Sequence, residues 1–204
     1  NCTFSDLSSN LNNNTSLIVI LNPSNNQSKV KETLKKDINI FSLELLPRIT
    51  RAPSMDVLSS QSNLAGYRSV VDSIYEFEKA IPMMMTAAGT VPAAKVLIIG
   101  AGVAGLQAIA TAKRLGAIVS ATDVRATSKE QVESLGGKFL TVKESEDLET
   151  EGGYAKEASE DLKKKQAEMM KEDIKKKEIV IWTALIAGKH AQRIISEEEV
   201  KLMR

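Results

Sequence analysis

The segment 95-KVLIIGAGVAGLQAIATAKRLGAIVSATD-123 decides the fold of this chain. An apolar strand, a glycine-rich turn, a helix and a second apolar strand follow one another, which is the order of a parallel strand–helix–strand unit. The turn holds Gly100, Gly102 and Gly105 in the spacing GxGxxG, and Asp123 stands at the end of the second strand. An acidic residue about 20 positions after such a turn is typical of dinucleotide binding.

Each of these residue types has a physical reason for its position. Gly100 permits a tight turn, Gly102 lets a pyrophosphate approach the backbone, and Gly105 lets the helix pack closely on the strand. The free N–H groups at the start of the helix then face the phosphates. Asp123 is expected to accept hydrogen bonds from the adenosine ribose and to repel the extra phosphate of NADP. Arg125 can accommodate that phosphate, so both cofactors stay open, with NAD(H) favoured because Asp123 holds the strand end.

More strands and helices extend this unit toward the C-terminus. The predicted elements are a helix over 128–135, a strand over 138–142, a charged helix over 154–178, a strand over 179–185 and a helix over 196–203. Ser128 is the expected N-cap of the first of these helices. The acidic segment 143–153 contains few apolar residues and is expected to be a mobile loop.

A smaller strand–helix–strand unit is predicted before the glycine-rich segment. Apolar runs at 17–21 and 38–46 flank a helix that Ser28 is expected to cap, so the two strands should pair in parallel. A polar loop containing 51-RAPSMDVLSS-60 then leads to an amphipathic helix over 63–80.

An apolar hairpin separates the two units. Its sequence is 82-PMMMTAAGTVPA-93, with a turn expected at Ala88-Gly89, while Pro92 favours an edge over a central strand. Three methionines in a row are more often found in packing, but these strands have no evident partner in their own chain. The hairpin therefore also fits an arm that contacts another molecule.

The predicted fold class is α/β, with two Rossmann-like units built on parallel sheets. The second unit is a dinucleotide-binding Rossmann domain that is expected to be missing its last strands. The predicted organisation is a polar, disordered segment over 1–16, the C-terminal part of a first lobe over 17–81, a hairpin arm over 82–93 and the Rossmann domain over 94–204.

The composition disfavours several other classes of function. A net charge of +1 over 204 residues and an aromatic content of 4% argue against nucleic acid as a partner. Residues 96–112 carry no charge but are fewer than the roughly 20 apolar residues of a membrane-spanning helix. The single Cys2 allows no internal disulfide, which suits a reducing compartment. No metal site is predicted.

The sequence offers little for proton transfer. Its one histidine, His190, has no carboxylate near it in the sequence. Dehydrogenases that act on an alcohol, an amine or an acid move a proton as well as a hydride, and they keep an acid–base residue for it. Hydride transfer from one nicotinamide to another needs no such residue, because the cofactors carry the chemistry.

Several long segments together resemble one family. They are 45-LLPRITRAPSMDVLSSQSNLAGYRSV-70, 82-PMMMTAAGTVPAAKVLIIGAGVAGLQAIATAKRLGA-117, 121-ATDVRATSKEQVESLGGKF-139, 152-GGYAKE-157 and 183-TALIAGK-189. In this order they are similar to the NAD(H)-binding alpha subunit, domain I, of proton-translocating nicotinamide nucleotide transhydrogenases. The resemblance covers residues 17–204. The family's domain is longer and has two lobes, so it implies that this chain lacks the start of the first lobe and the last strands of the second.

The resemblance implies a set of positions that contact NAD(H). Arg48, Asp56 and Ser59 match polar contacts at the nicotinamide end, which they would position for hydride transfer. The other positions that match contacts of the family with the dinucleotide are Ile49, Thr50, Val103, Asp123, Val124, Arg125, Gly153, Tyr154, Gln166 and Leu185. Gly153 and Tyr154 match the tip of a mobile loop that closes on the nucleotide.

Position 53 departs from the family's pattern. The family has a glutamine there whose amide reaches the nicotinamide riboses, whereas Pro53 has neither a side-chain amide nor a backbone N–H. Ala187 and His190 also stand where the family has prolines. These changes put efficient hydride transfer in question more than cofactor binding.

The resemblance also implies an activity and partners. The chain would bind NAD(H) and exchange hydride with NADP(H) held on a separate NADP-binding domain, coupled to a membrane-embedded proton-channel subunit. It would form a homodimer by exchanging the hairpin 83–93. It would lie in the cytoplasm, peripherally on the inner face of the inner membrane, or on the matrix side in mitochondria.

Two other functions stay open from the sequence. An alanine dehydrogenase-like enzyme is a relative of this fold, and it would need a proton-transfer histidine and a carboxylate-binding cation. A non-catalytic NAD-binding remnant fits Pro53 and the missing parts of both lobes.

Overall fold

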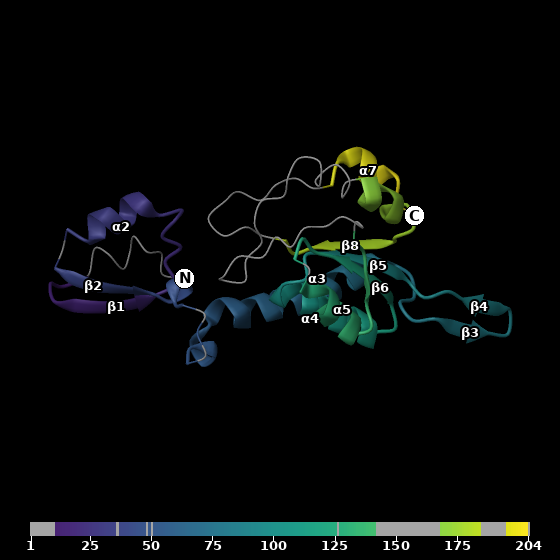
Figure 1. The fold of residues 1–204 in the computed structure, drawn as a ribbon, viewed down its shortest axis with the longest axis horizontal. Helices are drawn as coiled ribbons and strands as arrows, with labels where there is room; N and C mark the ends of the chain where they lie inside the picture. The colour runs from purple at the N-terminus through teal and green to yellow at the C-terminus, as the bar shows by residue number, and fades with distance from the viewer. Residues whose placement is uncertain are drawn as a thin grey trace. The chain divides into compact units, whose positions relative to one another are not determined.

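The computed structural model describes residues 11–35, 37–47, 49, 51–125, 127–141, 168–184 and 195–203. By spatial contacts the chain divides into an N-terminal unit, Asn1–Ser60, and a C-terminal unit, Gln61–Arg204. Both are α/β in character and contain parallel strands, as the sequence predicts (Figure 1).

The N-terminal unit contains the predicted strand–helix–strand arrangement. Strand β1 (Thr15–Val19), helix α2 (Gln27–Thr33) and strand β2 (Ile38–Ser42) follow one another, and the two strands pair in parallel. After β1, the Glu44 carboxylate accepts hydrogen bonds from the N–H groups of Leu21 and Asn22.

Some element ends in this unit differ from the sequence prediction. Thr15 and Ser16 belong to β1 because their backbones pair with β2, although they fall in a segment predicted to be disordered. Strand β2 ends at Ser42, since Leu43–Leu45 turns into a short 3₁₀ helix. Ser28 lies inside α2 rather than at its cap, which is Asn26.

The C-terminal unit is built around a four-stranded parallel sheet in the order β7-β6-β5-β8. The strands are β5 (Lys95–Ile99), β6 (Ile118–Thr122), β7 (Lys138–Phe139) and β8 (Ile179–Trp182), and the helices between and beside them are α3 (Val57–Glu76), α4 (Val103–Arg114), α5 (Ser128–Ser134) and α7 (Glu197–Lys201). Residues 168–174 are also helical. Strand β5 lies inside the sheet, between β6 and β8.

Helix ends in this unit follow local chemistry. Gly116, with φ +90°, follows the last residues of α4 and ends the helix. Ser196 and Glu199 form a capping box at the start of α7. Ser128 is not a cap: it is the first residue of α5, its side chain is buried, and its Oγ makes no hydrogen bond among the described residues.

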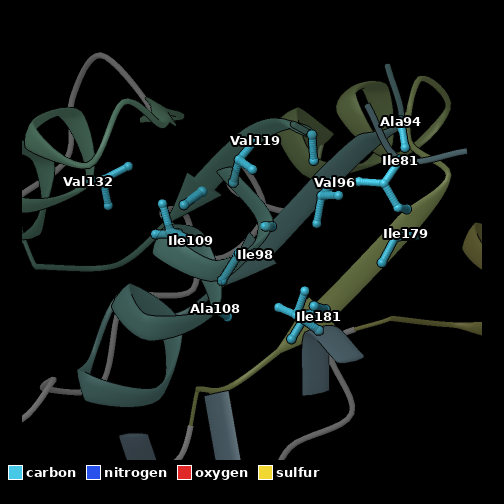
Figure 2. Packing of buried hydrophobic residues seen from close by; sticks show 14 of the residues in the cluster. Ile81, Ala94, Val96, Ile98, Ala108, Ile109, Val119, Val132, Ile179 and Ile181 are labelled. Carbon is cyan, nitrogen blue, oxygen red and sulfur yellow. The ribbon is translucent and has the colours of Figure 1, made fainter. Parts of the chain in front are cut away.

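Apolar side chains cover both faces of the sheet. Val96 and Ile98 of β5 pack on one face with Ala108 and Ile109 of α4 (Figure 2). Leu97 and Ile99 point to the other face, where they pack with Met170 and Ile174. A strand buried on both faces explains the unbroken apolar run VLIIG, which shows no alternation of polar residues.

The hairpin forms, with its turn one residue earlier than predicted. Strands β3 (Met84–Thr86) and β4 (Gly89–Val91) pair antiparallel, and Thr86 faces Gly89 across the turn. Gly89 has φ +129°, so it closes the turn as a strand residue with a backbone that favours glycine. All six strand residues are exposed.

Helix α3 approaches α4 at a glycine. A Cβ built on Gly66 would lie 2.0 Å from the carbonyl oxygen of Ala104. Only glycine permits this approach, so the start of α4 is braced by the backbone of α3.

We expect Gly66→Ala to destabilise the chain, although alanine favours a helix over glycine by about 1 kcal/mol. The new methyl group must push α3 from α4, and overpacking of this kind costs about 1–3 kcal/mol. Urea unfolding followed by circular dichroism measures the change. Asn63→Ala, at an exposed position of the same helix, is the control and should shift the free energy of unfolding by less than about 0.5 kcal/mol. Equal stability of both variants would contradict the close approach.

Candidate functional site

The segment 100–105, which joins β5 to the first residues of α4, is shaped by two glycines. Gly100 has φ +96°, and a Cβ built on it would lie 2.7 Å from the amide nitrogen of Ala184. A Cβ on Gly105 would lie 1.8 Å from the carbonyl oxygen of Gly100. Both positions therefore exclude any side chain, and the strand and the helix meet through bare backbone.

Gly102 differs from these two glycines. A Cβ built on it would meet only Nη2 of Arg125 within 4 Å, at 3.9 Å. The space above it is open, and α4 begins at the next residue. The first N–H groups of a helix have no carbonyl partner within it, and they form a natural anion site. An open cradle at Gly102, beside a helix start, fits a pyrophosphate.

Asp123, just after β6, lies beside this turn. Its Oδ2 accepts hydrogen bonds from the N–H of Ala101 at 2.6 Å and from Nη2 of Arg125 at 3.0 Å. Its Oδ1 accepts from the N–H and from Nε of Arg125, both at 2.9 Å. The side chains of Asp123 and Arg125 are 7% and 17% exposed. The carboxylate is thus fixed to the glycine turn and paired with one guanidinium.

Two opposing effects act on the pKa of Asp123. Burial alone would raise the pKa, but hydrogen bonds from the Arg125 side chain and from the N–H groups of Arg125 and Ala101 outweigh it, so the pKa lies below its ordinary value. The carboxylate is ionised at neutral pH. Its contribution to stability is present above the unfolded-state pKa and is lost as the pH falls through the lower folded-state pKa.

Thr183, which follows β8, stabilises the turn through hydrogen bonds to its backbone. Its hydroxyl donates to the carbonyl oxygens of Gly100, at 2.9 Å, and Ile99, at 3.3 Å. Thr183 is not among the site residues predicted from the sequence. The sequence signal that could have indicated Thr183 is its position: it is a hydroxyl residue directly after an apolar strand, and the carboxyl ends of parallel strands lie at the same edge of a sheet.

Val103 and Val124 lie near the turn in the sequence. Val103 is the first residue of α4, with its side chain 38% exposed, and Val124 is half-buried between Asp123 and Arg125. The structure therefore gathers the glycines and residues 123–125 around the carboxyl ends of β5 and β6.

A second group of predicted residues lies in the N-terminal unit. Asp56 precedes α3; its Oδ1 accepts from the N–H of Ser59 at 2.9 Å and its Oδ2 from the Ser59 hydroxyl at 2.6 Å. This is the geometry of a helix N-cap, which fixes both side chains. The cap also explains why α3 begins at Val57 rather than at the predicted residue 63.

Ile49 and Pro53 lie on the loop before this cap. Ile49 is 55% exposed. Pro53 is exposed and opens a short 3₁₀ helix, Pro53–Met55, at a position where a missing N–H costs no hydrogen bond.

Several predicted site residues lie outside the described residues. They are Arg48, Thr50, Gly153, Tyr154, Gln166 and Leu185. His190 and the acidic segment 143–153 also lie outside the described residues. In the parts of the chain that the structure describes, no cluster of three or more histidine, cysteine or acidic side chains could hold a metal ion. Within the same ranges, no helix has the length and apolar character needed to cross a membrane.

Comparison with known proteins places the chain in a family. The family model "Alanine dehydrogenase/PNT, C-terminal domain" matches residues 69–204, and the model "Alanine dehydrogenase/PNT, N-terminal domain" matches residues 5–65. The chain belongs to the alanine dehydrogenase/PNT family. A Rhodospirillum rubrum protein that is named as an NAD(P) transhydrogenase alpha subunit is 61% identical over 181 residues, which are 88% of this chain and 47% of that protein.

Solved structures of alanine dehydrogenase/PNT proteins and their relatives share the fold. The crystal structure of transhydrogenase from Sinorhizobium meliloti is 50% identical, with a TM-score of 0.84 over 97% of this chain and 53% of that one. An L-alanine dehydrogenase structure is 18% identical, with a TM-score of 0.71 over 97% of this chain and 49% of that one. The chain therefore spans about half the length of these relatives, and its sequence is far nearer to the transhydrogenase.

We expect two substitutions in the glycine-rich segment of this family member to affect stability differently, because one glycine is closely packed and the other borders open space. Gly105→Ala places a methyl group on the Gly100 carbonyl and should lower the free energy of unfolding by about 1–3 kcal/mol. Gly102→Ala is the matched control, because its Cβ enters open space and its φ of −76° suits alanine. Its stability should stay within about 0.5 kcal/mol of the parent's. Denaturant unfolding measures both, and a destabilised Gly102→Ala variant would contradict the open cradle.

Proposed function

We propose that the chain is the NAD(H)-binding component of a proton-translocating transhydrogenase, which exchanges hydride between NADH and NADP⁺ bound on a separate domain. One observation carries the proposal. The ionised Asp123 is hydrogen-bonded to a glycine turn that leaves open space at Gly102, in a chain that is 61% identical to a protein named as a transhydrogenase alpha subunit. The chain spans about half of that relative, so the activity is proposed for the whole protein.

The glycine turn holds the pyrophosphate in this proposal. The first N–H groups of α4 point toward the phosphates, and Gly102 leaves the space for them. Asp123 accepts from the adenosine ribose, and Val103, Val124 and Arg125 line that half of the dinucleotide. The ionised carboxylate favours NAD(H), since a 2′-phosphate would bring a second negative charge to it.

The loop before α3 positions the nicotinamide end. Arg48, Asp56 and Ser59 supply a guanidinium, a carboxylate and a hydroxyl, which hydrogen-bond the carboxamide and ribose, while Ile49 and Thr50 lie along the dinucleotide. The bound nicotinamide supplies the hydride. The chain's own contribution is to orient the ring and to exclude water, and it needs no acid–base residue.

Four more residues complete the proposed site through the resemblance to the transhydrogenases. Gly153 and Tyr154 would close over the bound nucleotide, and Gln166 and Leu185 would contact it. These assignments rest on the sequence alone, since all four lie outside the described residues.

The partners follow from the same proposal. An NADP-binding domain and a membrane-embedded proton-channel subunit complete the enzyme, and the chain lies peripherally on the inner face of the membrane, or on the matrix side in mitochondria. The exposed methionine hairpin would join two copies into a homodimer; Met83 and Met85 are 61% and 83% exposed.

An alanine dehydrogenase is the rival enzyme within the family. It would need a proton-transfer histidine, and the chain's one histidine, His190, lies outside the described residues. A binding protein without catalysis is the other alternative, and Pro53 is the feature that favours it.

The test uses the full-length parent protein mixed with an NADP-binding subunit of a related transhydrogenase. We expect NADH-dependent reduction of NADP⁺, a tighter dissociation constant for NADH than for NADPH by calorimetry, and no reduction of pyruvate in ammonium buffer. Gly102→Ala serves as the matched control, because it should keep the fold and lose NADH binding. Pyruvate turnover would instead identify an alanine dehydrogenase, and NADH binding without hydride transfer would identify the non-catalytic alternative.

Pro53→Gln tests the contribution of the loop. A glutamine amide at this exposed position can hold ribose hydroxyls, and small misplacements of reacting groups cost up to about 10²-fold in rate. We expect transhydrogenation to rise at least about tenfold, with the NADH dissociation constant changing less than about threefold. Stopped-flow and calorimetry measure the two. An unchanged rate with a fast parent would mean that the loop positions the nicotinamide without this amide.

A further inference from the structure

Asp123 and Arg125 form an ion pair, with no acceptor site of the carboxylate left over, at the place that the proposed function assigns to the adenosine ribose. A carboxylate offers about four acceptor sites. In this structure four N–H donors already point at them: the backbone amides of Ala101 and Arg125, and Nε and Nη2 of the Arg125 guanidinium. The pair is also shielded, with the Asp123 side chain 7% exposed.

A ribose that bonds to Asp123 must therefore displace donors that are already there. The two backbone amides are held by the fold, since Ala101 lies in the glycine turn and the N–H of neighbouring Gly100 donates to the Thr122 carbonyl at 2.8 Å. The guanidinium sits on a side chain with several rotatable bonds. Of the four donors, the two N–H groups of the guanidinium can therefore move away from Asp123 while the backbone stays in place.

The guanidinium also borders the phosphate cradle. Its Nη2 lies 3.9 Å from the Cβ position of Gly102, at the edge of the space through which a pyrophosphate would approach. A guanidinium released from Asp123 would thus remain close to the ribose, at the edge of this space. Guanidinium binds phosphate through charged, two-pronged hydrogen bonds.

We infer that Arg125 is a specificity-determining residue, which caps Asp123 in the free protein and leaves it when an adenosine ribose binds. This inference rests on the proposed NAD(H) function and deepens it. Because the two ribose hydroxyls must compete with the Arg125 guanidinium for the Asp123 carboxylate, this cap weakens the binding of NAD(H). A 2′-phosphate, in contrast, gains the released guanidinium as a partner. Arg125 therefore reduces the preference for NAD(H) over NADP(H) that Asp123 alone would impose.

The first test titrates the full-length parent protein and its Arg125→Gln variant with two probes, 5′-AMP and adenosine 2′,5′-bisphosphate, by calorimetry. Removing the cap should tighten 5′-AMP binding at least about threefold and weaken bisphosphate binding by at least about threefold. Arg125→Lys keeps the charge but not the two-pronged geometry, so it should fall between the parent and Arg125→Gln for 5′-AMP. Arg114→Gln, at the far end of α4, is the control for loss of one positive charge and should change neither affinity.

Each other outcome has a definite meaning. Weaker or unchanged 5′-AMP binding by Arg125→Gln would overturn the inference, because the guanidinium would then favour the bound nucleotide or leave it unaffected instead of competing with its ribose for Asp123. If Arg114→Gln changed the two affinities as much as Arg125→Gln does, the inference would also be overturned, because the change would then come from the overall charge of the protein. If the parent binds neither 5′-AMP nor NADH, the proposed function fails, and the inference falls with it.

A second measurement does not depend on any variant folding. In parent protein with isotope-labelled arginine, the Nε–H of Arg125 should exchange slowly with water while it caps Asp123, because it is bonded at 2.9 Å and shielded. Saturating 5′-AMP should shift this signal and speed its exchange. A signal that stays slow and unshifted at saturation would show that the pair remains closed, against the inference.

Discussion

The contact between the carbonyl oxygen of Gly100 and the backbone of Gly105 is the constraint on which the rest of the candidate site depends. No side chain fits between them, so β5 runs into α4 with the helix start held close to the strand end. The N–H of Ala101 then points at Asp123, and the hydroxyl of Thr183 reaches the Gly100 carbonyl. One turn thus fixes the positions of neighbours that come from three different strands.

The same turn sets the electrostatics of its surroundings. Burying a carboxylate is costly unless charge and hydrogen bonds compensate for it. Here the compensation comes from two backbone amides and one guanidinium, which keep Asp123 ionised. A negative charge held ready in a shielded place is what recognition of neutral hydroxyl groups requires. Another hydrogen-bond donor can compete for the Asp123 carboxylate, because some of its present donors belong to the Arg125 side chain, which can rotate away.

Much of this fold could be predicted from the sequence, since its strongest signals are local. The apolar run of β5, the three glycines and the acidic residue after β6 all lie in the segment 95–123, and the structure places them as expected. The parallel pairing of β1 with β2 also follows from a local strand–helix–strand pattern.

The details that could not be predicted depend on residues far apart in the sequence or on the exact turn geometry. Thr183 bonds to Gly100 across 83 positions, and no local pattern indicates that pairing. Two serines that looked like caps, Ser28 and Ser128, lie within the first two residues of their helices. Asn26 and Thr127 stand at the N-cap positions, and neither side chain makes the capping hydrogen bond by which a sequence pattern would be recognised. The carboxylate of Asp56 began α3 earlier than its apolar pattern suggested, since a cap needs no periodicity.

The exposed hairpin has a chemical consequence as well as a structural one. The thioethers of Met83, Met84 and Met85 are on side chains that are 61%, 42% and 83% exposed, whereas Met170 is 6% exposed in the core. Peroxide can therefore reach the first three without any unfolding, and it converts each apolar thioether into a polar sulfoxide. Three such conversions would replace exposed apolar groups of the hairpin with polar sulfoxides, so the redox history of a sample would change the chemical character of this surface.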